Sequence, residues 1–406
     1  MVPELATAVW CCADSPKNGT KGCEWHAVVR QLAGWQHSVW GASLMVAVTA
    51  SAQAAQGAQA ASPGWRIAHL FGTSTGVQQL DGVDAVSATD AWLTGEVFPA
   101  ASGQAPILVE RWAAGTWHQV PVPASLDAGG LSIAGDLVGA SSESNAWVFG
   151  GYQGSAGPFE VALGWNGTKW SRHTFPLWSS FNATAVFGTT NAWAFGENVQ
   201  SGQPFVVRFD GHAWHTATVP VVPQGASALS PSDIWIVGPQ GTARASTFAV
   251  ARWDGTSWHT VDLPKLSLPT GTALLSTDIL ALSPDDIWVT GSLAAGRGVA
   301  PGYVLLHLTS AGWDRVTVPY TPGVLSGISG DGHGGIWLNA PAATTAYSYF
   351  LHYAGGKWSR QLAPSTAGAV TEMNSISWAP GASSGWSGSA VITGDSEQGA
   401  LLTYSP

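Results

Sequence analysis

Several carboxylates lie outside the recurring positions of this 406-residue sequence, and they are the groups best suited to catalysis. They are Glu96, Glu110, Asp136, Glu160, Glu197, Glu372 and Asp395. Hydrolysis of a glycosidic bond normally needs two carboxyl groups about 5–10 Å apart. The sequence does not show that any two of these groups converge. A polysaccharide-active enzyme, glycosidase or lyase, is therefore one alternative function, and no catalytic residue is assigned.

The sequence offers little for metal or thiol chemistry. The three cysteines all precede residue 24, so no cysteine nucleophile, disulfide framework or thiolate metal site is expected in the main body. No histidine pair at i and i+4, no His-Glu-x-x-His motif and no calcium loop is present. Three histidines directly follow recurring tryptophans, which predicts a repeated surface position: His118, His215 and His259. We expect neither a metal site nor a cofactor.

Aromatic residues outside the repeated positions are the candidates for ligand binding, because aromatic faces bind sugars. The predicted ligand-binding residues are Trp178, Tyr320, Tyr152, Tyr303, Phe181 and Tyr347. Charged residues make up only 10% of the chain, and the net charge is −10 with no basic stripe. Nucleic acid is therefore not expected as a partner, since its binding depends on neutralising phosphates. A neutral polysaccharide or a protein surface suits this composition better than an ionic ligand.

An internal repeat must position these residues. Asp90-Ala91-Trp92-Leu93-Thr94-Gly95 returns as Asp-Ile-Trp-Ile-Val-Gly at 233–238 and in five other copies. Its tryptophans recur about every 49 residues, a pitch typical of four-stranded propeller blades. They are Trp92, Trp147, Trp193, Trp235, Trp288, Trp337 and Trp386.

A second repeated tryptophan opens the last strand of each unit. It occurs at Trp117, Trp170, Trp214, Trp258, Trp313 and Trp358, which is one copy fewer than the first motif. Gly64-Trp65 begins a strand of the same form at the start of the chain, and the last unit stops near Tyr404 where its final strand should follow. We therefore predict an all-β, seven-bladed propeller of four-stranded antiparallel blades, with the N-terminal strand completing the last blade.

The repeated positions are expected to serve the scaffold. The tryptophans should pack between blades, because each buried indole removes about 150–250 Å² from water. Gly is expected to end the second strand. The acids and amides before the first tryptophan are expected to cap the turn after the inner strand: Asp90, Asn145, Asn191, Asp233 and Asp286.

Residues 64–406 resemble known propeller repeats. Val148-Phe149-Gly150-Gly151-Tyr152, with Trp170 and Pro176 downstream, resembles the kelch-type blade, and Asp331 to Trp337 resembles sensor-type periplasmic propellers. The resemblance implies the fold. The copper site of the kelch-type galactose oxidase requires a cysteine, which the body of this chain lacks, and the clustered arginines of sialidase-type propellers have only Arg244 and Arg297 as loop counterparts.

Residues 1–60 have a different composition from the rest. Arg30 precedes an apolar run at 39–50, followed by Ala-x-Ala steps that predict cleavage near residue 54 or 60. The run is shorter than the about 20 residues of a membrane span. We expect a secretory signal segment in residues 1–60, no membrane span, and a single propeller domain at 61–406.

The connections that vary in length should carry the function, because binding residues sit mostly on loops of a rigid scaffold. The hairpins between second and third strands and the links between blades share one face of a propeller. The predicted function is a secreted, monomeric, non-catalytic binding or scaffolding module that recognises neutral glycan there. The alternatives are a polysaccharide-active enzyme and a protein–protein interaction module at the cell envelope.

Overall fold

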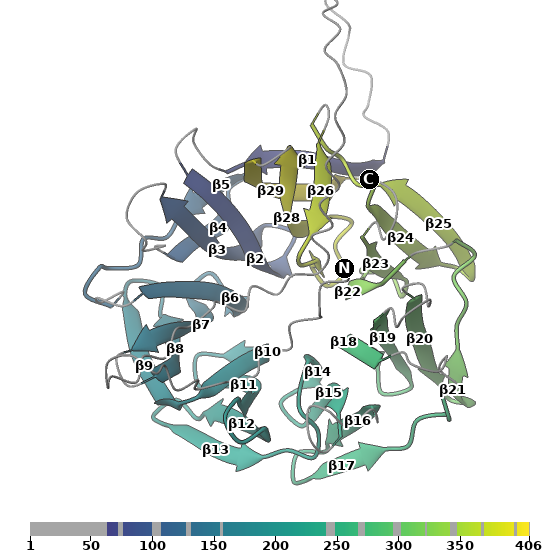
Figure 1. Ribbon diagram of the computed structural model, residues 1–406, viewed down its shortest axis with the longest axis horizontal. Coiled ribbons are helices and arrows are strands. Elements are labelled where there is room, and N and C mark those ends of the chain that lie inside the picture. The colour runs from purple at the N-terminus through teal and green to yellow at the C-terminus, as the bar shows by residue number, and fades with distance from the viewer. Residues whose placement is uncertain are drawn as a thin grey trace, which may run out of the picture. The chain divides into compact units, whose positions relative to one another are not determined.

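The computed structural model describes residues 63–71, 76–99, 107–126, 131–154, 157–240, 248–266, 273–294, 302–320, 323–341, 347–366, 369–393 and 396–405. The regular elements of these residues are all β-strands, arranged as seven antiparallel sheets around one axis (Figure 1). The predicted seven-bladed propeller is confirmed. The expected signal segment lies outside the described residues.

The blades follow one another along the chain, each with its first strand nearest the axis and its fourth at the periphery (Figure 1). Blade 1 is β2 (Gly76–Ser87), β3 (Asp90–Pro99), β4 (Ile107–Ala113) and β5 (Thr116–Gln119). Blade 2 is β6 (Leu131–Ser142), β7 (Asn145–Gly154), β8 (Gly157–Trp165) and β9 (Trp170–Leu177). Blade 3 is β10 (Ser179–Gly188), β11 (Asn191–Asn198), β12 (Gln203–Phe209) and β13 (Trp214–Thr218).

The remaining blades repeat this order. Blade 4 is β14 (Gly225–Ser230), β15 (Asp233–Pro239), β16 (Phe248–Trp253) and β17 (Trp258–Val261). Blade 5 is β18 (Ala273–Ser283), β19 (Asp286–Ala294), β20 (Gly302–Thr309) and β21 (Gly312–Arg315). Blade 6 is β22 (Ser326–Gly330), β23 (Ile336–Ala340), β24 (Tyr349–Ala354) and β25 (Lys357–Leu362). Blade 7 is β26 (Val370–Met373) with β27 (Ser377–Trp378), β28 (Gly385–Thr393), β29 (Ser396–Ser405) and β1 (Gly64–Leu70).

Strands from the two ends of the described chain complete blade 7. β1 pairs antiparallel with β29, and Trp65 lies opposite Tyr404. The order β26–β28–β29–β1 supplies the fourth strand that the C-terminal repeat lacks. The predicted ring closure is therefore present, and it covers the outer edge of β29.

The repeated tryptophans fill the interfaces between blades, as predicted. Trp147 of blade 2 lies 5.0 Å from the Phe209 ring and 5.1 Å from the Trp214 ring of blade 3. Trp337 of blade 6 meets Trp65 and Tyr404 of blade 7 in the same way, at 5.7 and 5.2 Å. Seven buried clusters of this kind correspond to the seven interfaces. The hydrophobic core is thus a ring of separate layers.

The residue opposite the repeated tryptophan on the third strand is cationic or a histidine in five blades. These residues are Arg111, Arg208, Arg252, His307 and His352. Their side chains lie over the indoles: the Arg252 guanidinium is 5.0 Å from the Trp235 ring and the His307 ring 3.7 Å from Trp288. Trp288 and Trp337 thus contact aromatic rings of the next blade and an imidazole of their own blade.

The acids before the tryptophan bind across the blade, so the prediction that they cap the inner turn was wrong for Asp90 and Asp233. Arg111 Nε donates to Asp90 Oδ1 at 2.8 Å, and Arg252 makes two bonds of 2.8 Å to Asp233. Serine hydroxyls bond within the turns instead, as where Ser230 Oγ accepts the Ser232 N–H. The aspartate binds the arginine and not the turn, because the guanidinium that lies over the indole directs its N–H groups toward the carboxylate.

The glycine of the first motif does not end the second strand, contrary to expectation. β3, β7, β11 and β19 continue past this glycine. A Cβ on Gly196 or Gly238 would collide with the backbone carbonyl of Ser180 or Val222. The glycine is needed because the chain entering or preceding the inner strand crosses the second strand at close range.

Side chains of the inner strands tie neighbouring blades together. The Ala140 N–H of β6 donates to Asp84 Oδ2 of β2 at 2.7 Å, and the Ala281 N–H of β18 donates to Ser227 Oγ of β14 at 2.9 Å. The corresponding bond from Ala85 to Ser377 joins blade 1 to blade 7 across the closure. The inner wall is therefore held by polar bonds as well as by apolar layers.

Candidate functional site

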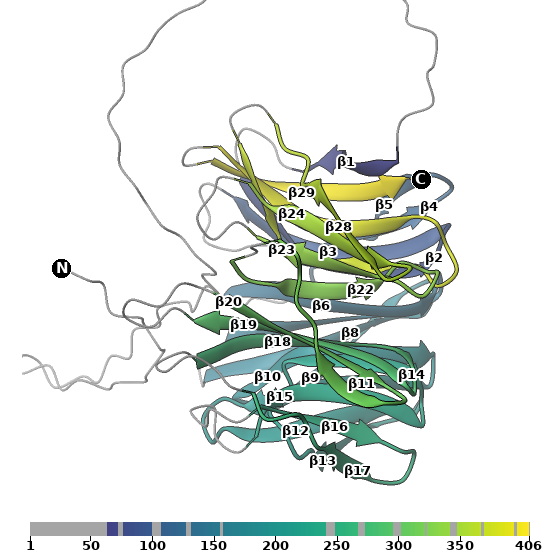
Figure 2. The same cartoon turned by 90° about the vertical axis from the view of Figure 1, so that its right-hand side faces the viewer.

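Two kinds of connection share one edge of the ring, which we call the loop face. Because the strands of each blade alternate in direction, the hairpin between second and third strands and the link to the next blade emerge on the same edge. The short turns between first and second, and third and fourth, strands form the opposite edge, the turn face. Figure 2 shows the ring side-on, with the strands running between these edges.

Large apolar side chains that stand in solvent belong to the loop face. In the described part of the chain, four are exposed by 40–55%: Leu177, Val199, Tyr347 and Leu362. Val199 and Tyr347 follow second strands, and Leu177 and Leu362 end fourth strands. Each therefore lies where a hairpin or an inter-blade link leaves the scaffold. Exposed apolar groups gathered on one edge indicate an interaction surface.

The first group of such residues is Leu177, Trp178 and Val199, which we call the Trp178 patch. The Val199 N–H donates to the Trp178 carbonyl oxygen at 2.8 Å, so the hairpin of blade 3 is bonded to the link that enters it. Trp178 has φ +71°, in the left-handed region that a bulky residue rarely adopts. Such strain is concentrated at functional sites, because elsewhere a glycine would relieve it.

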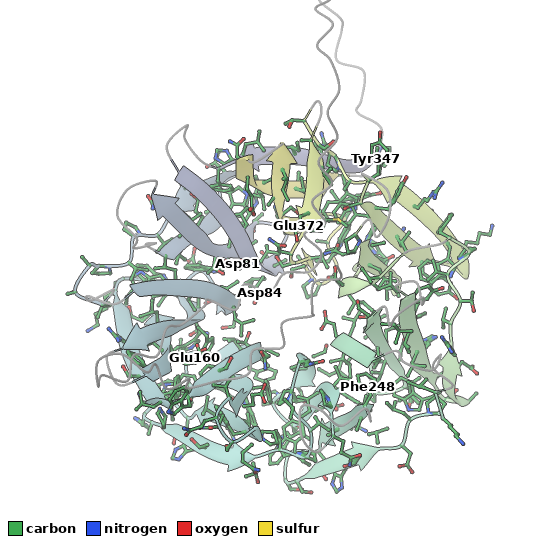
Figure 3. The ribbon with its side chains drawn as sticks, viewed as in Figure 1. Asp81, Asp84, Glu160, Phe248, Tyr347 and Glu372 are labelled. Carbon is green, nitrogen blue, oxygen red and sulfur yellow. The ribbon has the colours of Figure 1, made fainter. Side chains whose placement is uncertain are left out.

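The second group lies on blade 6 and comprises Tyr320, Tyr347, Tyr349, Arg360 and Leu362, which we call the tyrosine patch. The Arg360 guanidinium carbon lies 5.0 Å from the centre of the Tyr320 ring and 5.1 Å from that of Tyr349. Tyr349 is directly opposite Leu362 in the β24–β25 pair. Figure 3 shows Tyr347 at the periphery of the ring, beside blade 6.

The structure brings together some of the six predicted ligand-binding residues and separates others. Trp178, Tyr320 and Tyr347 belong to the two patches. Tyr303 lies beside the tyrosine patch but is used structurally, because its hydroxyl accepts the Val318 N–H at 2.9 Å. Phe181 is only 4% exposed and packs against Phe149 and Phe175 in the layer between blades 2 and 3.

Phe181 is therefore a core residue, because the start of β10 turns its ring toward blade 2. Tyr152 lies in β7, and its side chain is outside the described part of the structure. The sequence did not single out Leu177, Val199, Leu362 and Arg360. The only feature of the sequence that could have identified them is their position at or near the ends of strands with alternating apolar and polar residues.

Two carboxyl groups on blade 7 have raised pKa values. Burial raises the pKa of Glu372 on β26, and the charge of Glu397 on β29 raises it further. Burial likewise raises the pKa of Glu397, which the sequence had not singled out. Both lie on the same side of the sheet, flanking β28, near the hairpin of the loop face. Figure 3 places Glu372 toward the centre of the ring.

Of the other carboxylates that the sequence analysis named, Glu110, Glu160 and Glu197 lie on β4, β8 and β11. Glu160 is 7% exposed, and burial raises the pKa of Glu110, which the nearby His118 partly offsets. The side chains of Glu96 and Asp136, and all of Asp395, lie outside the described structure, as do Arg244 and Arg297.

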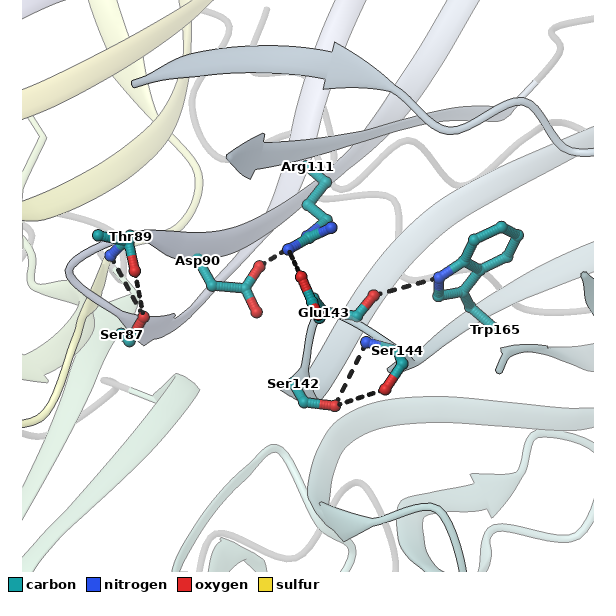
Figure 4. A network of polar contacts seen from close by, with 8 residues as sticks. All are labelled: Ser87, Thr89, Asp90, Arg111, Ser142, Glu143, Ser144 and Trp165. Atoms are coloured by element: carbon teal, nitrogen blue, oxygen red, sulfur yellow. Dashed lines mark hydrogen bonds and ion pairs between the residues drawn. The ribbon is translucent and has the colours of Figure 1, made fainter. Parts of the chain in front are cut away.

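The turn face carries a shallow pocket of about 580 Å³ between blades 1 and 2. Arg111 donates to Asp90 of its own blade and, through Nη2, to Glu143 of the next blade at 2.9 Å (Figure 4). Ser142 and Ser144 bond to each other in the adjoining turn. This arrangement resembles a clamp between blades, since both acids neutralise the one cation.

The described residues contain no group of three or more His, Cys, Asp or Glu placed to hold a metal ion. Two histidines at the predicted surface position bind turn acids: His215 Nε2 lies 2.7 Å from Asp210 and His259 Nε2 lies 2.7 Å from Asp254. No helix of the described part is long and apolar enough to span a membrane.

No family model and no curated protein matches the sequence. Solved propellers are similar in structure. The GH74 xyloglucanase of Xanthomonas campestris has TM-score 0.53 and 15% identity over 83% of this chain and 53% of its own, so this chain spans about half of it. A Dyadobacter fermentans protein of unknown function has TM-score 0.50 and 9% identity over 84% and 100%.

The propeller domain of the Trilobed protease from Pyrococcus furiosus has TM-score 0.50 and 7% identity over 81% of this chain and 95% of its own. At such identities these similarities establish the propeller fold and nothing finer. No family model supports the kelch-type resemblance.

Proposed function

We propose that this protein is a secreted, non-catalytic binding propeller that holds a predominantly neutral glycan on its loop face. The observation that carries the proposal is the placement of the exposed apolar side chains. In the described part of the chain they stand at the loop face, beside Trp178 and three tyrosines. Flat aromatic faces with few charges suit the apolar faces of sugar rings.

The repeated aromatic residues support this assignment, because they pack in the scaffold. The tryptophans of the first motif are buried between blades, and in blades 1, 4, 5 and 6 an arginine or histidine of the third strand binds an aspartate of the same blade. The exposed large apolar side chains of the described part of the chain, in contrast, lie in or beside the variable connections. This division is expected when a rigid ring carries a binding surface on its loops.

The binding proposal is tested by pulling down the purified mature protein with a panel of insoluble polysaccharides. Trp178→Ala and Tyr347→Ala should each lower retention at least several-fold while leaving the melting temperature nearly unchanged. His259→Ala is the control, because it removes an exposed aromatic side chain away from the loop face. Unchanged retention of both loop-face variants on the polysaccharides would refute the proposed binding surface.

A polysaccharide-active enzyme is the second candidate, and the Glu372–Glu397 pair is the observation that favours it. Burial raises the pKa of both carboxyl groups, and the charge of Glu397 raises that of Glu372 further, so the two groups can divide the roles of acid and base. Soluble product sugars on prolonged incubation, abolished by Glu372→Gln or Glu397→Gln, would establish catalysis. Retention without release would leave binding as the function, and a stoichiometric co-purifying protein would favour an assembly module.

Secretion is tested separately. N-terminal sequencing of protein from the culture fluid should give a mature chain that begins near residue 55 or 61. A mature chain that begins before Ala52 would refute the signal segment.

A further inference from the structure

The Arg360 guanidinium lies over two aromatic rings near the loop face. Its guanidinium contacts Tyr320 and Tyr349 at 5.0 and 5.1 Å, and both rings pack against the layer between blades 5 and 6. The Tyr320 hydroxyl also donates to the Trp358 carbonyl oxygen at 3.4 Å. A guanidinium that lies over aromatic rings keeps its N–H groups as hydrogen-bond donors.

Arg360, unlike Arg111 and Arg252, has no neutralising acid in the described part of the chain. Arg111 is paired with Asp90 and Glu143, and Arg252 with Asp233. In the described part of the chain, no carboxylate forms an ion pair with Arg360, and its side chain is exposed. In a chain of net charge −10, an unpaired cation beside exposed aromatic residues is complementary to an anion.

We propose that Arg360 is an anion subsite that binds the carboxylate of a uronic-acid unit carried by an otherwise neutral polysaccharide. The proposal rests on the glycan-binding function proposed above and specifies the glycan. The guanidinium donates two parallel N–H···O bonds to the carboxylate, and the exposed Tyr347 and Leu362 contact the apolar side of neighbouring sugar units.

The charges favour a carboxylate on a sparsely charged chain. One guanidinium neutralises one carboxylate, whereas a phosphate monoester carries about −1.5 to −2 at neutral pH. The net charge of −10 would repel a uniformly charged polyanion. A mostly neutral chain with isolated uronate units avoids that repulsion and satisfies both the aromatic rings and the single cation.

The subsite is tested by calorimetric titration of the full mature protein with glucuronoxylan and with the same polymer after chemical reduction of its carboxyl groups. The wild-type protein should bind the native polymer roughly tenfold more tightly, as expected for one charge-assisted bidentate contact. Arg360→Gln should abolish this difference, so that the variant binds the native and the reduced polymer with equal affinity. Arg360→Lys should retain only part of it, because an ammonium lacks the planar fork.

Arg208→Gln is the matched control. Arg208 is also exposed and stacked on an indole, Trp193, at 5.0 Å, but lies in the middle of blade 3, away from the tyrosine patch. This variant should keep the full preference for the native polymer. If Arg360→Gln does not fold, competition settles the question on the wild-type protein: free glucuronate should displace the native polymer at concentrations where glucose does not.

The outcomes separate the two proposals. Equal wild-type affinity for both polymers overturns the anion subsite and leaves glycan binding intact. Binding of neither polymer overturns the glycan function and the subsite with it. Binding of an acidic peptide at Arg360 in place of either polymer overturns the proposal in favour of a protein ligand.

Discussion

The layers between blades and the two patches of the loop face contain similar residue types in different surroundings. Trp337 is 1% exposed and is enclosed by Trp65, Trp378 and Tyr404, whereas Tyr347 is 55% exposed. Arg252 is bonded twice to Asp233, whereas Arg360 stacks on two rings without a carboxylate. The repeated tryptophans and the residues opposite them thus form the scaffold, whereas the proposed binding surface consists of side chains at strand ends and in the connections.

Truncation of a tryptophan in a layer between blades should cause the largest loss of stability. Trp337→Ala should destabilise the protein by about 3–5 kcal/mol, because it opens a cavity among aromatic side chains that cannot collapse. Thermal unfolding followed by circular dichroism measures the effect. A loss below that of Trp178→Ala would show that the layers do not hold the ring.

The clamp of the turn face can be divided into its two bonds. Arg111→Gln should cost about 1–3 kcal/mol, because the Asp90 carboxylate, which is 8% exposed, then lacks its cation. Glu143→Gln should cost less than about 1 kcal/mol, since that side chain is 72% exposed and its ion pair is screened. Denaturant titration of both variants gives the ratio, and equal losses would contradict the assignment.

The inner wall should respond to pH. Burial raises the pKa of Asp84 to about 6, with the Ala140 N–H lowering it and Asp90 raising it further. A carboxyl whose pKa is higher when folded binds a proton more readily in the native state, so its stabilising contribution is full below about pH 4 and is lost as pH rises through about 6.

Asp84→Asn should therefore raise stability at pH 7 by about 1–2 kcal/mol if the amide oxygen keeps the Ala140 bond, and have little effect at pH 4. Ser227→Ala is the control, because it removes the corresponding bond to Ala281 without removing a charge. Its loss should be the same at both pH values. A pH-independent effect of Asp84→Asn would refute the assignment.

The smallest expected difference in stability concerns two replacements of Trp178 on the loop face. Trp178→Gly should be more stable than Trp178→Ala by about 0.5–1 kcal/mol, because glycine adopts φ +71° without strain. Both variants should lose glycan retention equally. If alanine proves the more stable replacement, the backbone at this position is not strained.

Much of the fold could be predicted because the same local pattern is written seven times. The spacing of Trp92 and its copies, the outer-strand tryptophans, and the unpaired Trp65 strand together require seven blades and a closure between the ends. Strands that are consecutive in the sequence pair with each other in a blade. A four-stranded blade can therefore be predicted from the alternation of apolar and polar residues and from the turn residues.

The candidate site was only partly predictable. Trp178, Tyr320 and Tyr347 lie at the loop face as expected, yet Phe181, which comes from the same link, is buried against Phe149. Whether a ring at the end of a strand faces solvent or the next blade depends on the twist and stagger between blades. The sequence does not show that Arg252 has an acid partner and that Arg360 has none, because acid partners are supplied by other strands.

The sequence by itself determined the number of blades, the tryptophan layers and the closure of the ring, since these follow from periodicity and short-range strand pairing. Tertiary structure alone decided which unrepeated side chains stand in solvent, why Asp84 has a raised pKa and where Arg360 lies between two tyrosines. The reason is physical: exposure and charge neutralisation depend on residues that other strands and neighbouring blades bring close in space.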